Sequence, residues 1–151
     1  FGIEAIPWLT STKWAMPSII IMSIWKTVGW NMVVFLAGLQ GIPDSFYDAA
    51  EIDGAGRWAT FRYITLPLLR PTTLLAVVMS LIASSQVFDQ IYVMTGGGPG
   101  YSTMTLVQQV YNAAFQNYEM GYASAVSVIL LLLVVSLSFL QFKFFREEIE
   151  Y

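Results

Sequence analysis

Three long apolar stretches dominate the chain, at about residues 14–39, 72–94 and 122–142. As helices, each can cross the roughly 30 Å hydrocarbon core of a bilayer, because a helix rises about 1.5 Å per residue. Charged side chains gather between the stretches and at the C-terminus. The pattern predicts an all-α integral membrane protein, with three transmembrane helices in one domain over residues 1–151.

The two connections between the stretches differ in charge. Basic residues lie in the first connection, about residues 40–71, and at the C-terminus: Arg57, Arg62, Arg70, Lys143 and Arg146. The second connection, about residues 95–121, contains no Lys or Arg. Short loops rich in Lys and Arg stay cytoplasmic. We therefore expect 40–71 and the C-terminus inside, and 95–121 outside, together with the N-terminus despite Lys13.

Composition excludes most other classes of function. Hydrophobic residues make up 56% of the chain and charged residues 11%, against roughly 45–50% and about 25% in soluble domains. Cys and His are absent, which removes disulfides, a thiolate nucleophile, an imidazole base and the usual zinc or iron sites. A net charge of −3 without a basic stripe gives no footprint for nucleic acid. We expect no catalytic residue and no metal or cofactor bound by this chain.

The polar connection predicts two short helices. Ser45 and Asp48 form an S-x-x-D start, in which short side chains bond to free backbone amides. Gly54 supplies a helix end, since glycine tolerates left-handed backbone. A second helix is expected over about 57–65.

One face of the first short helix is small and flat, with Phe46, Ala49, Ala50 and Asp53 at helical spacing. We expect an exposed pair of alanines there, which would let a helix of another protein approach closely. The alternative is a helix that lies on the membrane surface and only connects two spans. Periodicity does not separate these interpretations. Pro67 disfavours helix at the residue before it.

The motif D-A-A-E-I-D-G, nine residues, then I-T-L-P resembles the signature loop of permease subunits in bacterial ATP-driven (ABC) importers, whose pattern is E-A-A-x3-G-x9-I-x-L-P. In that family the loop enters a cleft of the ATPase subunit and couples its closure to opening of the transmembrane path. Asp48 stands where the family usually has Glu, so its carboxylate is one methylene shorter. The resemblance implies ATPase-coupling roles for Asp48, Ala49, Ala50, Asp53, Gly54, Arg57, Ile64, Leu66 and Pro67.

Further motifs resemble the carbohydrate branch of these permeases, the maltose and glycerol-phosphate type. They are L-x-x-I-P before the signature, F-D-Q-I-Y-V-M-T-G-G-G-P-G, and G-Y-A-S-A. The resemblance implies import of a sugar or related polar solute across the bacterial inner membrane. It also implies three kinds of partner: a dimer of ATP-binding subunits holding ATP-Mg, a second permease subunit and an extracytoplasmic solute-binding protein. Such permeases have six or more spans, so we expect this chain to be part of a longer protein.

Polar residues inside the apolar stretches are candidates for a substrate path, because they are costly in a membrane unless they face a cavity or a partner helix. The resemblance also implies a place for the sugar, because the maltose-type permease holds its sugar at corresponding places on the helices of the first two stretches, 14–39 and 72–94. The candidates are Ser23, Lys26, Thr27, Trp30, Ser80, Ser84 and Gln86.

Each candidate also has a structural interpretation. The hydroxyls are small enough to let helices pack closely, and Trp30 serves either as a sugar-stacking face or as packing. Lys26 is expected to face a wet cavity or to pair with an acid elsewhere in the complex. We expect Asp89 and Gln90 to be solvated near the outer face.

The segment T-G-G-G-P-G lacks the G-K-[ST] ending of phosphate-binding loops and predicts a tight turn. We expect this turn to lie near a docked binding protein. The leading hypothesis is thus a non-enzymatic permease subunit. The rival is a membrane scaffold that recruits a cytoplasmic partner through the same loop and transports nothing.

Overall fold

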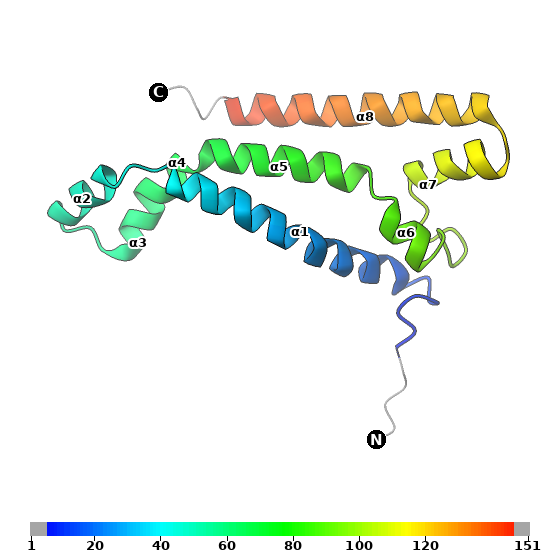
Figure 1. Ribbon diagram of the computed structural model, residues 1–151, viewed down its shortest axis with the longest axis horizontal. Helices are drawn as coiled ribbons and strands as arrows, with labels where there is room; N and C mark the ends of the chain where they lie inside the picture. Colours follow the sequence, from blue (N-terminus) through cyan, green and yellow to red (C-terminus); the bar gives the residue numbers. More distant parts are fainter. Residues whose placement is uncertain (1–5, 147–151) are drawn as a thin grey trace, which may run out of the picture.

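The computed structural model describes residues 6–146, and the side chains of residues 6–143. Its elements are α1 (Ala15–Gln40), α2 (Ser45–Ile52), α3 (Arg57–Thr60), the π-helix η1 (Phe61–Thr65), α4 (Leu66–Leu68), α5 (Arg70–Ser85), α6 (Asp89–Met94), α7 (Leu106–Tyr111), the π-helix η2 (Asn112–Gln116) and α8 (Met120–Arg146). Figure 1 shows α5 between α1 and α8, with α2 and α3 at one end of these helices and α6 and α7 at the other. The all-α prediction is confirmed.

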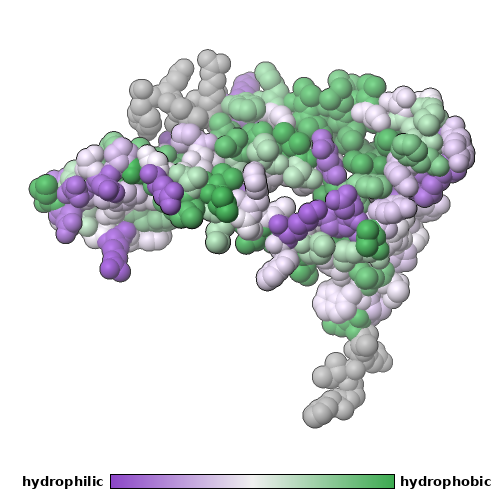
Figure 2. Space-filling model, in the orientation of Figure 1, coloured by the Kyte–Doolittle hydropathy of each residue, from purple (hydrophilic) through white to green (hydrophobic). Residues whose placement is uncertain are grey.

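Two helices, α1 and α8, are long and apolar enough to cross a membrane. The described residues contain a third candidate if the helical segments 57–68 and 70–85, bent by 62° relative to each other, are counted as one span. Large apolar side chains remain exposed, such as Trp25 at 84%. Figure 2 shows hydrophobic residues along α5 and α8 and hydrophilic residues over the α2 end. Such a surface suits a membrane protein.

The second apolar stretch, expected as one span over about 72–94 that is interrupted by polar residues near its far end, is divided into two helices at that end. Helix α5 already begins at Arg70 and ends at Ser85, and α6 begins separately at Asp89. The hydroxyls of Ser84 and Ser85 both donate to the carbonyl of Leu81, at 2.9 and 2.8 Å. Hydroxyls that bond to nearby backbone carbonyls bend or weaken a helix. Two such hydrogen bonds to one carbonyl lie directly before the end of α5.

The segment expected as a loop over 95–121 contains α7 and η2. The side chain of Thr105 caps α7 by accepting a hydrogen bond from the Gln108 amide at 3.3 Å. Three small buried residues, Ala113, Ala114 and Ala123, pack η2 against the start of α8. Small residues let two helices approach closely, so this segment is folded onto the third apolar helix.

Helix α2 begins at Ser45 as predicted, although its N-cap, Asp44, makes no side-chain capping bond. Gly54 follows the helix with φ of +74°, as expected of a left-handed helix end. The second short helix begins at Arg57 and continues to Leu68 through η1 and α4. The two-helix prediction is therefore confirmed, with a longer second helix.

Pro67 lies inside helical structure, contrary to expectation. A proline ring normally clashes with the carbonyl four residues earlier and lacks an N–H to bond to it. Here the preceding turn is a π-helix, in which the amide of Leu66 donates to the carbonyl of Phe61, five residues back. This wider turn accommodates the proline without ending the helix.

The alanine pair is only half exposed. Ala49 faces solvent, whereas Ala50 is buried, with 5% exposure. The amide of Ala55 donates to the Ala50 carbonyl at 2.9 Å, and the Tyr47 hydroxyl lies 3.3 Å from that of Thr65. These contacts fold α2 back toward η1, so the expected flat Ala-Ala patch is not present.

A close crossing of α1 and α5 lies near the α2 end. A Cβ atom on Gly38 would lie 2.5 Å from Thr72 Oγ1, whereas one on Gly29, in the same helix, would meet nothing within 4 Å. Gly38→Ala should therefore destabilise the permease by about 1–3 kcal/mol, the usual cost of overpacking. Gly29→Ala should be neutral or slightly stabilising.

Thermal unfolding of the full-length permease in its assembled complex measures this difference. Thr72→Ala should restore part of the stability that Gly38→Ala loses. Equal unfolding temperatures for the two glycine variants would contradict the close crossing.

Candidate functional site

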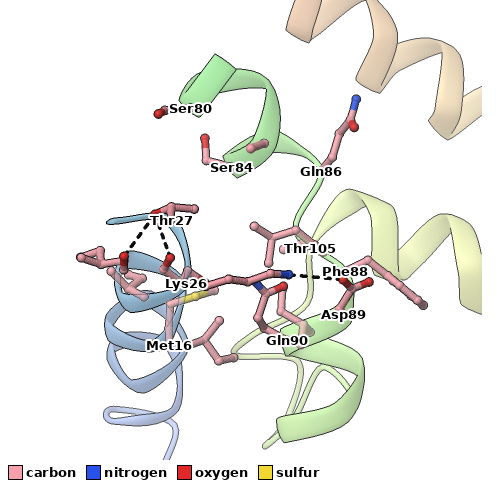
Figure 3. Close-up of a pocket in the computed structure, with 17 residues that line it drawn as sticks. Met16, Lys26, Thr27, Ser80, Ser84, Gln86, Phe88, Asp89, Gln90 and Thr105 are labelled. Carbon is pink, nitrogen blue, oxygen red and sulfur yellow. Dashed lines mark hydrogen bonds and ion pairs between the residues drawn. The ribbon is translucent and has the colours of Figure 1, made fainter. Parts of the chain in front are cut away.

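A cavity of about 470 Å³ lies between α1, the end of α5 and α6. Figure 3 shows its lining side chains converging from these elements and from Thr105. The lining residues are Met16, Ile19, Ile20, Ser23, Ile24, Lys26, Thr27, Ser80, Ala83, Ser84, Gln86, Val87, Phe88, Asp89, Gln90, Ile91 and Thr105. The wall therefore combines apolar surface with a small set of polar groups, which is the usual make-up of a small-molecule site.

Six of the seven predicted path residues line this cavity. They are Ser23, Lys26, Thr27, Ser80, Ser84 and Gln86. Trp30 does not line it, and the indole is 62% exposed. The break between α5 and α6 opens the wall at Gln86, so the helix end that sequence reasoning missed is also part of the site.

Two hydroxyls of the cavity wall, those of Thr27 and Ser84, are tied to their own helices. Thr27 donates to the carbonyl of Ser23 at 2.9 Å and Ser84 donates to that of Leu81 at 2.9 Å. Their oxygens keep lone pairs that can accept a hydrogen bond from a solute. Between α1 and α5, the side-chain Nδ2 of Asn31 donates to the hydroxyl of Ser80 at 3.5 Å. The Thr27 and Ser84 hydroxyls therefore present acceptors to a solute in the cavity.

Lys26 pairs with Asp89 inside this chain. Lys26 Nζ lies 3.5 Å from Asp89 Oδ2, and the two side chains are 53% and 78% exposed. Figure 3 shows the pair reaching across the cavity from α1 to α6. Lys26 was expected to face a wet cavity or to pair with an acid elsewhere in the complex. It lines the cavity, and its acid lies 63 positions away in the same sequence.

The expected solvation of Asp89 and Gln90 is thus incomplete. Asp89 is exposed but paired, and Gln90 is buried, with 8% exposure. One signal in the sequence pointed to the pair: Lys26 and Asp89 are the only Lys, Arg, Asp or Glu residues in the apolar stretches 14–39 and 72–94. Two opposite charges in apolar surroundings favour each other as partners.

The turn beyond α6 is tight, as predicted. Gly96, Gly97 and Gly100 have positive φ. The hydroxyls of Thr95 and Thr103 lie 2.7 Å apart, and Thr103 donates to the carbonyl of Gly98 at 2.8 Å. These bonds hold the two ends of the glycine turn together, beyond the end of α6.

Four aromatic rings join α6 to α7 and η2. Phe88 stacks on Tyr92, Tyr92 meets Tyr111, and Tyr111 contacts Phe115, with centroids 5.2–5.4 Å apart along this chain of rings. The Tyr111 hydroxyl donates to that of Tyr92 at 3.5 Å. This hydrogen bond, with the nearby Tyr92 charge and slight burial, raises the pKa of Tyr111. The rings hold α6, and with it Asp89, against α7.

At the opposite end, the predicted coupling residues surround the α2–α3 turn. Asp48, Ala49, Asp53, Gly54, Arg57 and Leu66 are exposed, Ile64 and Pro67 are half-buried, and Ala50 is buried. A second hollow of about 440 Å³ lies between the two short helices. Its walls include Tyr47, Glu51 and Arg57. The exposed members form a polar, accessible surface at the tip of the molecule.

Comparison with known proteins places the chain in a family. The family described as binding-protein-dependent transport system inner membrane component matches residues 1–147. The chain is 44% identical to the lactose transport system permease protein LacF of Rhizobium radiobacter, over 96% of this chain and 50% of that protein. It spans about half the length of the curated relatives it matches.

Two solved structures share the fold. A bacterial ABC transporter involved in the import of the acidic polysaccharide alginate superposes with a TM-score of 0.86 at 26% identity, covering 99% of this chain and 52% of that chain. A bacterial alginate ABC transporter in complex with alginate pentasaccharide-bound periplasmic protein gives 0.81 at 27% identity, covering 93% and 49%. The carbohydrate-importer resemblance of the motifs is thereby confirmed. The chain belongs to the family of binding-protein-dependent transport system inner membrane components, and it is a membrane protein.

Proposed function

We propose that this chain is part of the permease subunit of an ATP-driven importer for a sugar or related polar solute in the bacterial inner membrane. One observation carries the proposal: the same helices connect the cavity with the two-helix segment. Helix α1 lines the cavity through Ser23 and Lys26 and ends at Gln40, directly before α2. Helix α5 leads from the same segment back to Ser84 at the cavity.

The exposed surface around Asp48, Ala49, Gly54 and Arg57 is the proposed docking element for an ATPase subunit. The resemblance of this segment to the signature loop supports that role, and the positive-inside rule supports its cytoplasmic placement. The described C-terminal end of α8 lies at the same end of the molecule as α2 (Figure 1). Lys143 is there, while the side chain of Arg146 and the residues after it lie outside the described residues.

The proposed partners follow from this arrangement. A dimer of ATP-binding subunits would hold ATP-Mg at the cytoplasmic face, and a second permease subunit would complete the path. A solute-binding protein would dock near the glycine turn on the other face, as the similar alginate transporter is in complex with a periplasmic protein. In this proposal the ATP-binding subunits hydrolyse ATP, and this chain supplies the contacts to the ATPase and to the solute.

The Ser, Thr and Gln side chains of the cavity support a polyhydroxylated solute. Sugar hydroxyls both donate and accept hydrogen bonds, so they match a wall of hydroxyl and carboxamide groups. The apolar wall from α1 suits the carbon faces of a sugar ring. Lactose and alginate, named for two similar proteins, are both carbohydrates.

Stimulation of ATP hydrolysis tests this function. The full-length permease, its partner permease and its ATPase are reconstituted in liposomes, and the solute-loaded binding protein is added. Hydrolysis should rise when the loaded binding protein is present, because closing of the ATPase is coupled to the permease. A membrane scaffold that only recruits the ATPase would give the same hydrolysis with and without the binding protein.

A further inference from the structure

We infer that Lys26, Asp89 and Gln90 form an electroneutral hydrogen-bonding subsite that selects an uncharged, polyhydroxylated solute. The inference rests on the proposed function, because it assigns the substrate class of the same cavity. The similar proteins leave this class open: lactose is uncharged, whereas alginate is described as acidic.

The charges of the cavity cancel. Among the described residues that line it, Lys26 is the one cation and Asp89 the one anion, and the other polar groups are hydroxyls and carboxamides. The two charges lie 3.5 Å apart. A solute anion that approached Lys26 would also meet the Asp89 carboxylate, and a solute cation would meet Lys26. Neither sign of charge gains a net partner.

The pair is open to a ligand. Both side chains are more than half exposed, and the distance of 3.5 Å lies at the outer limit of a hydrogen bond. The ammonium has three N–H donors and the carboxylate has two acceptor oxygens, so most of this capacity is unused. Neighbouring hydroxyls on a sugar fit such a pair, because one hydroxyl can donate to Asp89 while the next accepts from Lys26.

Gln90 adds unused hydrogen-bonding capacity beside the pair. Its side chain lines the cavity, is more than nine-tenths buried and makes no hydrogen bond to any other described residue. Figure 3 shows Gln90 beside the Lys26–Asp89 pair. The oxygen and nitrogen of this carboxamide keep some accessible surface, so they can reach a solute in the cavity. A solute hydroxyl would bond to it, since a carboxamide donates and accepts as a hydroxyl does.

The charge balance is tested first, without knowledge of the solute. A cysteine is introduced as Ser84→Cys in the whole transporter, and its reaction rates with an anionic sulfonate and a cationic trimethylammonium methanethiosulfonate are compared. In the parent protein the ratio of rates should match that of free cysteine within about threefold. Asp89→Asn should favour the anionic reagent by roughly tenfold, and Lys26→Gln the cationic one. Ratios that move in neither variant would overturn the inference.

Substrate class is tested by uptake. Proteoliposomes with the complete importer and its binding protein are offered uncharged sugars and the matching uronates. The transported solute should be uncharged. Lys26→Gln and Asp89→Asn should each lower its uptake roughly tenfold, because each leaves one unpaired charge. The double variant should recover part of the loss. Glu119→Gln removes a charge outside the cavity and should leave uptake unchanged.

The two claims fail in different ways. A uronate carried as the preferred solute would overturn the charge inference while leaving an importer. Absence of ATP-driven uptake of every solute would contradict the proposed function, and the reagent ratios would still decide whether the cavity is electroneutral.

Discussion

Gly54→Val is expected to lower ATP-driven uptake roughly tenfold while the permease still inserts into the membrane. Gly54 has φ of +74°, a conformation that costs other L-residues about 1–2 kcal/mol and a β-branched residue more. Since about 1.4 kcal/mol corresponds to a tenfold change in an equilibrium, the population of correctly oriented α2–α3 turns should fall by about that factor. No neighbour lies within 4 Å of the new Cβ atom, so the effect is one of backbone conformation.

Gly56→Ala is the matched control in the same turn. Gly56 has φ of −71° and ψ of 162°, which any residue adopts, and open space surrounds its Cβ position. Uptake by this variant should equal that of the parent protein. Uptake per membrane-inserted permease is the quantity to compare. Normal uptake by Gly54→Val would remove the α2–α3 turn from the coupling mechanism.

Ser84→Trp is expected to lower uptake by roughly tenfold to a hundredfold. Ser84 lies at the end of α5 and lines the cavity of about 470 Å³, which an indole would partly fill. Overpacking a site costs typically about 1–3 kcal/mol, and here the cost falls on the solute-bound state. Uptake should fall more than ATP hydrolysis, because the substitution is remote from the two-helix segment.

Leu75→Trp on the same helix provides the control. Leu75 is exposed and does not line the cavity, so uptake should change little. Trp30→Ala separates the two interpretations of that indole: as an exposed residue outside the cavity it should leave uptake nearly unchanged. Loss of uptake in Trp30→Ala equal to that in Ser84→Trp would extend the path beyond the cavity described for this chain.

The long helices could be predicted because each apolar residue in a stretch adds to the evidence for a membrane-spanning helix. Many consecutive apolar residues specify α1 and α8, and no single contact decides their bounds. The start of α2 and the turn at Gly54 were also predictable, since both depend on the residue types at the helix ends. Their evidence lies within a few neighbouring residues.

Other features depend on tertiary contacts. The burial of Ala50 requires the hydrogen bonds of Ala55 and Tyr47, which periodicity does not contain. The helix at Pro67 depends on the wider turn of η1 before it. The break after Ser85 replaces a continuous apolar helix with two elements and turns Asp89 toward Lys26, a contact across 63 positions. The path residues were found because they are polar where the chain is apolar, whereas Gln90 looked merely terminal.

Solute accumulation and ATP hydrolysis measured in the same proteoliposomes test the central claim most directly. The complete importer, with the full-length permease, should accumulate solute only when both ATP and the loaded binding protein are present, and each rise in hydrolysis should be accompanied by uptake. Binding-protein-dependent ATP hydrolysis with no accumulation of any solute, in a permease with an intact cavity, would contradict the claim that this chain links its two-helix segment to a solute path.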